Sequence, residues 1–138
     1  MLTVVAALIE SEGKLLVCQR RRGDTFELMW EFPGGKVKLG EALEAALARE
    51  LSEELGVHAR IGPEAYRTRH QYAELSEPIE LFFFAASIDG KEPINLAFQK
   101  IAWREPASLS ELNFLPADRE LITQLVSGAL RLPRTEGS

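Results

Sequence analysis

The sequence predicts an α/β sandwich formed by one domain over residues 1–127, and three observations lead to that prediction. An amphipathic helix is expected from Glu41 to Leu55, with strand-like segments before and after it. A second helix is expected from Pro116 to Val126. A chain of 138 residues has the length of one ordinary domain and can bury a core. Residues 128–138 are predicted to form a flexible tail.

The composition is typical of a soluble globular protein, with 46% hydrophobic and 27% charged residues. The net charge of −5 argues against a nucleic-acid polymer as partner, so a polyanionic substrate would need metal ions or a local basic patch. The single cysteine allows no internal disulfide and favours a reducing, cytoplasmic compartment. No apolar run has membrane-spanning length and no signal peptide is recognised, so no membrane partner is expected. We expect a monomer or a homodimer.

The N-terminal segment is predicted to be a β-hairpin. Thr3–Ile9 is an apolar run typical of a buried strand, Ser11–Gly13 is a turn signal, and Lys14–Gln19 continues as a second strand. Cys18 lies in that strand, where a buried structural thiol is expected rather than a nucleophile. The loop from Arg20 to about Leu28 opens with three arginines, which either contact phosphate or are ordinary surface side chains: Arg20, Arg21 and Arg22.

The helix expected from Glu41 to Leu55 contains no Gly or Pro and is rich in strong helix formers. Its leucines recur every four residues and form one apolar stripe: Leu43, Leu47, Leu51 and Leu55. Glu41 and Glu44 are expected in the first turn, where the helix dipole favours acids. Gly56 is expected to cap the helix in the left-handed conformation, with Val57 making an apolar contact.

Three acids near the end of this helix are unusual. Glu50, Glu53 and Glu54 have i, i+3, i+4 spacing, so they are expected on one face, where they repel one another. The dipole also disfavours anions at this end, and Arg49 supplies only one neighbouring positive charge. The acids form either a solvated acidic face or a site for a hard divalent cation, since Mg²⁺ is bound by carboxylates together with substrate phosphates.

The segments after the helix are predicted to be mainly strands. A strand start at 57–61 is expected to end at a Gly62–Pro63 break, and Tyr66–Tyr72 is a second candidate strand. Ile79–Ile88 is expected to be a central strand covered on both faces, with its aromatics in the core rather than stacked on a base: Phe82, Phe83 and Phe84.

The C-terminal third is predicted to hold a short strand and two helices. Lys100–Arg104 is the strand, with Trp103 in the core, and about Leu109–Leu112 is a short helix. The final helix starts with a proline in its first turn and turns three apolar side chains inward: Leu121, Ile122 and Leu125. The two histidines, His58 and His70, are expected to be structural or surface residues.

The stretch Gly35–Val57 resembles the Nudix box at every defined position. The box reads Gly, five residues, Glu, seven residues, Arg-Glu, an aliphatic residue, one residue, Glu-Glu, one residue, Gly and an aliphatic residue. The preceding Trp30–Gly34 is similar to the approach to the box in MutT-type Nudix hydrolases. This resemblance, which extends from about Thr3 to Val126, implies a Nudix fold with a mixed β-sheet sandwiched between helices. It favours the cation site over the solvated face.

The resemblance also implies an activity. MutT-type enzymes use Mg²⁺, or Mn²⁺, to convert a nucleoside triphosphate to the monophosphate and pyrophosphate, and the substrate here is expected to be 8-oxo-dGTP-like or CTP-like. By resemblance, Glu50, Glu54 and the Gly34 carbonyl hold the metal, Glu53 assists the attacking water, and Arg49 orients a glutamate. Further residues are expected to bind the nucleotide substrate: Arg20, Arg21, Glu31, Phe32, Pro33 and Asp118.

Two of these substrate-binding candidates have alternative interpretations. Asp118 is either an acid favoured by the dipole at the helix start or, by resemblance to the base-reading Asn of MutT enzymes, a residue that reads the base. An ionised Asp only accepts hydrogen bonds, which favours cytosine or 8-oxoguanine over uracil or thymine. Phe32 packs either against the base or in the core.

One departure from the family pattern concerns a distal acid. Many relatives carry a Glu shortly before an Ile-x-Trp segment, but Asn95–Gln99 contains no acid here. Glu80 is a tentative substitute. Two other functions stay open: a Nudix hydrolase of a nucleotide sugar or dinucleoside polyphosphate, and a non-catalytic nucleotide-binding Nudix module. The complete acid set disfavours the latter.

Overall fold

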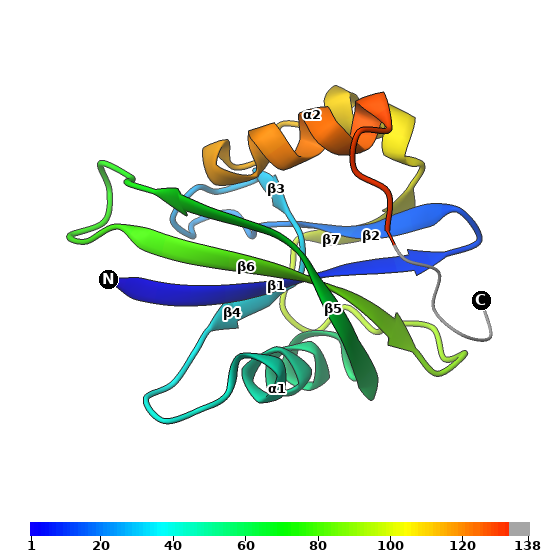
Figure 1. Ribbon diagram of the computed structural model, residues 1–138, viewed down its shortest axis with the longest axis horizontal. Helices are drawn as coiled ribbons and strands as arrows, with labels where there is room; N and C mark the ends of the chain where they lie inside the picture. Colours follow the sequence, from blue (N-terminus) through cyan, green and yellow to red (C-terminus); the bar gives the residue numbers. More distant parts are fainter. Residues whose placement is uncertain (133–138) are drawn as a thin grey trace.

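The structure, a computed structural model, describes residues 1–132 and has one mixed sheet between two helices. Helix α1 (Leu43–Leu55) covers one face of the sheet and α2 (Arg119–Ser127) covers the other (Figure 1). This confirms the predicted α/β sandwich. Part of the predicted tail, residues 133–138, lies outside the described residues.

Seven strands and two short 3₁₀ helices complete the fold. The strands are β1 (Leu2–Ser11), β2 (Lys14–Gln19), β3 (Trp30–Glu31), β4 (Gly34–Lys36), β5 (Ala59–His70), β6 (Ile79–Ile88) and β7 (Lys100–Arg104). The 3₁₀ helices are η1 (Pro106–Glu111) and η2 (Pro116–Asp118). Neither α1 nor α2, the α-helices of residues 1–132, has both the length and the apolar character of a membrane span.

Strand β1 is the centre of the sheet. Along one edge it pairs in parallel with β6, from Leu2 opposite Ile79 to Ile9 opposite Ala86. Along the other edge it pairs antiparallel with β4 and, only at its end, with β2. The predicted hairpin therefore exists at the turn, but β2 then leaves β1 and lies between β3 and β7.

The alternation of side chains along the strands builds two separate cores. Phe83 is buried in the core on the α2 face, whereas Phe82 and Phe84 are buried in the core on the α1 face. This division confirms that Ile79–Ile88 is a strand covered on both faces and that its phenylalanines are core residues. Cys18 is fully buried in the α1-side core, and burial raises the pKa of its thiol well above the ordinary value, as suits a structural cysteine.

The start of α1 differs from the prediction. The helix begins at Leu43, and Ala42 before it has extended backbone angles. Glu41 therefore lies outside the first turn, and its carboxylate instead accepts a hydrogen bond of 3.0 Å from the Lys38 amide and two from Arg49. The other end agrees with the prediction, because Gly56 adopts the left-handed conformation (φ 63°) and its amide bonds the Ser52 carbonyl.

The predicted break at Gly62–Pro63 is wrong. Strand β5 runs through these residues, and its register against β6 shifts between Ile61 and Glu64 and again before Tyr66. Such a bulge at the edge of a sheet accommodates a proline, which cannot donate to the ladder. The strand then ends at His70, so Tyr72 lies in the turn that follows.

The C-terminal third contains three smaller differences. The predicted final helix is divided into η2 and α2, so Asp118 precedes α2 rather than lying inside its first turn. The short helix expected near Leu109–Leu112 is the 3₁₀ helix η1. Trp103 is only half-buried against the α1-side core. The inward direction of the three apolar α2 side chains is confirmed, since all are buried: Leu121, Ile122 and Leu125.

Candidate active site

A cavity of about 340 Å³ runs between Glu54 on α1 and Asp118 in η2. Its polar lining comes from several segments: Arg20, Glu31, Lys36, Glu54, Tyr72 and Asp118. Apolar side chains line the part between Tyr72 and Asp118: Phe26, Phe32, Leu75, Ile79 and Leu81. One end of the cavity lies at Glu54 and the glycines of β4; with the neighbouring Glu50 and Arg49 it is hereafter the acidic end. The other end is largely apolar with a buried carboxyl and is hereafter the apolar end.

The acidic end is built on a glycine that no other residue can replace. A Cβ on Gly34 (φ 155°) would lie 2.0 Å from the Val5 carbonyl oxygen. The amide of Gly34 donates a 3.0 Å hydrogen bond to Oε1 of Glu54. Because Ala6 and Gly34 are a non-hydrogen-bonded pair of the β1–β4 ladder, the Gly34 carbonyl also points away from β1.

Glu50 reaches the same strand one residue further along. A Cβ on Gly35 would lie only 2.5 Å from the carboxyl carbon of Glu50, so the glycine makes room for this carboxylate. Burial, followed by the charge of Glu50, raises the pKa of Glu54 to about 8, and the charge of Glu31 adds to the shift. Without a cation, Glu54 therefore holds a proton at neutral pH.

Arg49 is bound to three glutamates. Its guanidinium forms two hydrogen bonds with Glu41, at 2.8 and 3.0 Å, and one of 2.9 Å with Glu50. Contact with Glu53 is longer, at 3.4 Å, and the Glu53 side chain is 57% exposed. The hydrogen bonds from Arg49 hold the pKa of Glu41 near 2. Glu50 and Glu53 therefore both face Arg49, as their spacing on one face of the helix predicts, but Glu53 is the more exposed of the two.

The donor set at the acidic end suits Mg²⁺. Glu50 and Glu54 supply carboxylate oxygens beside the Gly34 carbonyl, and this ion is usually held by one or two carboxylates plus substrate phosphates. Within residues 1–132, no group of three or more His, Cys, Asp or Glu side chains has metal-binding geometry by itself. The set therefore fits a cation whose coordination is completed by substrate and water rather than a closed protein site.

Asp118 forms the far wall of the apolar end. Its side chain is 3% exposed and makes no capping hydrogen bond, although Asp118 directly precedes α2 as the helix-start interpretation expects. Burial and then the charge of Glu31 raise the pKa of Asp118 well above the ordinary value. The shift favours the neutral acid, which both donates and accepts, over the ionised, accepting form that the sequence argument assumed.

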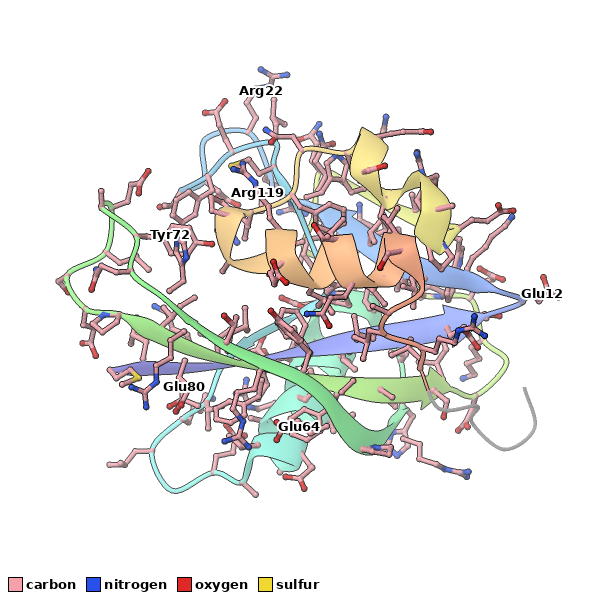
Figure 2. The ribbon with its side chains drawn as sticks, turned by 45° about the horizontal axis from the view of Figure 1, so that its top comes forward. Glu12, Arg22, Glu64, Tyr72, Glu80 and Arg119 are labelled. Carbon is pink, nitrogen blue, oxygen red and sulfur yellow. The ribbon has the colours of Figure 1, made fainter. Side chains whose placement is uncertain are left out.

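Arg20 and Glu31 form an ion pair on the cavity wall. The Nη1 atom of Arg20 lies 3.2 Å from a carboxylate oxygen of Glu31, and its Nε donates a 2.7 Å hydrogen bond to the Thr25 carbonyl. Burial raises the pKa of Glu31, although Arg20 opposes the shift. Two other arginines of the loop do not line the cavity: Arg21 approaches the Leu96 carbonyl at 3.5 Å, and Arg22 points into solvent (Figure 2).

The remaining candidates divide between the core and the cavity. Phe32 does both, because it lines the cavity and its ring packs 5.4 Å from Phe114. Pro33 is buried and its carbonyl accepts a 2.8 Å hydrogen bond from Ala7, so it belongs to the sheet and not to the cavity wall. Glu80 is paired with Arg69 at 3.3 Å and is likewise absent from that wall; it lies on the α1 side of the sheet, apart from Tyr72 (Figure 2).

The sequence does not identify the two aromatic cavity residues Tyr72 and Phe26 as site candidates. Tyr72 and Phe26 face each other with ring centroids 4.7 Å apart, and the Tyr72 hydroxyl accepts a hydrogen bond from the Ala117 amide. These contacts join segments far apart in the chain, so no local spacing could reveal them. Neither His58 nor His70 lines the cavity, in agreement with the prediction.

A mixed sheet between two helices, with an acidic helix facing a glycine strand, is the arrangement of the Nudix fold. Residues 1–125 match the NUDIX domain family, and the chain belongs to this family. The family resemblance inferred from the sequence is thereby confirmed.

Named relatives match along nearly the whole chain. It is 37% identical over 128 residues to the 8-oxo-dGTP diphosphatase of Haemophilus influenzae, covering 92% of this chain and 93% of that protein. It is 35% identical over 139 residues to the CTP pyrophosphohydrolase of Escherichia coli K12, covering 97% and 96%. The solution structure of the E. coli ORF135 protein matches with a TM-score of 0.81 and 33% identity, covering 99% and 94%.

Proposed function

We propose that the chain is a Mg²⁺-dependent pyrophosphohydrolase that converts a nucleoside triphosphate to the monophosphate and pyrophosphate. The observation that supports this most directly is that one cavity joins an acidic end that suits metal-bound phosphates to an apolar end that suits a base. The names of the relatives, an 8-oxo-dGTP diphosphatase and a CTP pyrophosphohydrolase, agree with a nucleoside triphosphate as substrate.

Members of the family generally need a divalent metal ion. In our proposal Glu50, Glu54 and the Gly34 carbonyl hold Mg²⁺, with Mn²⁺ as an alternative. The bound cation would neutralise phosphate charge and lower the pKa of a bound water. Arg49 holds Glu50 in place through its 2.9 Å hydrogen bond. Glu53, whose carboxylate is accessible to solvent, takes the proton of the water that attacks phosphorus, and pyrophosphate leaves.

The base is proposed to lie at the apolar end, in contact with Phe32 and Asp118, while Arg20 and Glu31 line the passage toward the phosphates. Arg21 and Pro33 lie off the cavity wall and are dropped from the proposed substrate contacts. We propose a cytosine or 8-oxoguanine triphosphate as the preferred substrate, in agreement with the names of the relatives. The neutral Asp118 carboxyl would offer one donor and one acceptor to the edge of such a base. The single cysteine supports a cytoplasmic location.

The test is a phosphate-release assay over a panel of nucleoside triphosphates, nucleotide sugars and dinucleoside polyphosphates. We expect hydrolysis of triphosphates with Mg²⁺ or Mn²⁺ at concentrations on the order of millimolar and none in EDTA. Full activity in EDTA would contradict the metal mechanism. Preferential cleavage of nucleotide sugars or dinucleoside polyphosphates would contradict the substrate class. Nucleotide binding without turnover would identify a non-catalytic module.

A further inference from the structure

Tyr72 connects two distant parts of the apolar end. It lies in the turn after β5, and its hydroxyl oxygen accepts a buried 2.9 Å hydrogen bond from the backbone amide of Ala117 in η2. The two residues are 45 positions apart in the sequence. Figure 2 shows Tyr72 beside the start of α2, consistent with this contact. The bond therefore fixes the position of η2 relative to the β5–β6 end of the sheet.

The residue next to Ala117 is Asp118, and its carboxyl has little local support. Asp118 makes no side-chain capping bond, and its own amide donates to the Leu115 carbonyl at 2.9 Å. The location of the carboxyl in the cavity thus depends on the backbone of η2, which Tyr72 holds. Because the Tyr72 hydroxyl is the acceptor in its bond with Ala117, its own proton remains available to another acceptor in the cavity.

The ring of Tyr72 contacts two other rings, that of His70 at a centroid distance of 4.3 Å and that of the strained loop residue Phe26. Phe26 contacts it at a centroid distance of 4.7 Å and has φ 59°, which is rare for a bulky side chain. Leu28 in the same loop also has a positive φ (61°) and donates a hydrogen bond to the Arg20 carbonyl. Such conformations persist where the surroundings enforce them, and they concentrate at ligand sites. Phe26, Tyr72 and Asp118 all line the cavity.

We propose that Tyr72 is a positioning residue for base selection: its hydroxyl holds η2 so that Asp118 meets the edge of the base, and its ring with Phe26 forms the adjoining wall. This inference rests on the proposed function. The acids at the other end of the cavity do not contact Tyr72, so its role concerns substrate affinity and choice of base, and not the hydrolytic step.

The test uses Tyr72→Phe, which keeps the ring and removes the hydroxyl. We expect the KM for the preferred triphosphate to rise about fivefold or more, with kcat within about twofold of wild type, and the ratio of kcat/KM between bases to fall. CTP, 8-oxo-dGTP and dTTP are compared with Mg²⁺ present. Tyr66→Phe is the matched control, because Tyr66 lies in β5, packs on Phe83 and is absent from the cavity lining.

A second variant separates positioning from a general loss of packing. In an Asp118→Ala background, Tyr72→Phe should leave the ratio between bases unchanged, because it acts through Asp118. Equal effects of Tyr72→Phe in both backgrounds would overturn the inference. Phe26→Leu, which leaves the Tyr72 hydroxyl in place, should raise KM without lowering kcat. An unchanged KM would show that the wall formed by Phe26 and the Tyr72 ring does not contribute to substrate binding.

The possible outcomes distinguish failure of this inference from failure of the proposed function on which it rests. A wild-type protein that hydrolyses none of the triphosphates would overturn the proposed function and the inference together. An active wild type whose KM and base ratio are unchanged in Tyr72→Phe would overturn the role of Tyr72 alone. Thermal melts of each variant establish that the protein compared is folded.

Discussion

The two ends of the cavity differ in how they are assembled. At the acidic end, Arg49, Glu50 and Glu54 belong to one helix and meet the adjacent glycine strand. At the apolar end, Phe26 comes from a loop, Tyr72 from a turn and Asp118 from a 3₁₀ helix. Their electrostatics differ too, because the acidic end concentrates charges that repel one another, whereas the apolar end isolates one carboxyl in a hydrophobic wall.

This contrast indicates which kinetic properties substitutions at each end of the cavity can change. Helical spacing fixes the acids relative to one another, so the acidic end can preserve one chemistry while other parts of the chain change. The apolar end depends on loops and turns, where substitutions alter shape without disturbing the sheet. We therefore expect substitutions at the acidic end to change kcat, and substitutions at the apolar end to change KM and the choice of base.

The largest effect is expected from Glu54→Gln. Removing this carboxylate charge from the proposed metal site should lower kcat by about a hundredfold or more. The measurement is kcat at saturating Mg²⁺ and substrate, with Glu44→Gln, an exposed acid of the same helix, as the matched control. A near-normal kcat for Glu54→Gln would remove this residue from the metal site and would break the proposed division between the ends.

A smaller effect is expected from Asp118→Ala. Loss of the only buried acid of the apolar end should lower kcat/KM for the preferred base by about tenfold or more and flatten the preference among bases. The assay compares all triphosphates with wild type and with Asp118→Asn, which retains a donor and an acceptor. If Asp118→Ala changes only the melting temperature, and the ratios between bases stay the same, the carboxyl has no part in base selection.

Stability without metal provides a third test of the acidic end. The pKa of Glu54 is raised from 4.5 to about 8, so the folded state binds this proton more tightly than the unfolded state does. Its stabilising contribution is therefore complete below pH 4.5 and is lost as the pH rises through about 8. Glu54→Gln lacks this titration.

Melting curves in EDTA at pH 5 and pH 9 measure the difference. The Tm of Glu54→Gln minus the Tm of wild type should be higher at pH 9 than at pH 5 by on the order of 5 °C. For Glu44→Gln the same difference should not change with pH. If the Tm difference between Glu54→Gln and wild type is the same at pH 5 and pH 9, the surroundings of Glu54 do not destabilise its ionised carboxylate. Saturating Mg²⁺ should remove the advantage of the Gln variant, because the cation compensates the charge.

The smallest effect is expected from Glu80→Gln. Glu80 is paired with the well-exposed Arg69 and lies outside the cavity lining, so kcat and KM should stay within about twofold of wild type. Its steady-state kinetics are measured beside those of Glu54→Gln. A loss comparable to that of Glu54→Gln would restore Glu80 as the replacement for the distal acid of the family.

The sequence predicted helix α1 of the acidic end well because the information for this helix is local. The leucine stripe and Gly56 determine α1, and the spacing of Glu50 and Glu54 follows from helical geometry. The positions of Glu41 and Glu53 are harder to predict. Arg49 binds Glu41, which lies outside the helix, while Glu53 stays largely exposed. Those choices depend on side-chain contacts that periodicity does not describe.

The strands were predicted where apolar runs are long, and missed where they are short. β6 agrees with the prediction, whereas β3 and β4 have only two and three residues and were not expected. Gly62–Pro63 normally interrupts a strand, but an edge position and a bulge absorb it here. The contact of Tyr72 with Ala117 has no local signature, since it exists only after the sheet and η2 have come together.

The central position of β1 also sets an order of events during synthesis. Its parallel partner β6 starts at Ile79, so the first strand made must wait for the second half of the chain before it can pair along that edge. Closing so large a loop is slow, and apolar surface stays uncovered meanwhile. A ribosome-bound chain that has released Glu54 but not Asp118 would hold the proposed metal ligands without the proposed place for the base. We therefore expect nascent chains to begin binding nucleotides only after η2 has emerged.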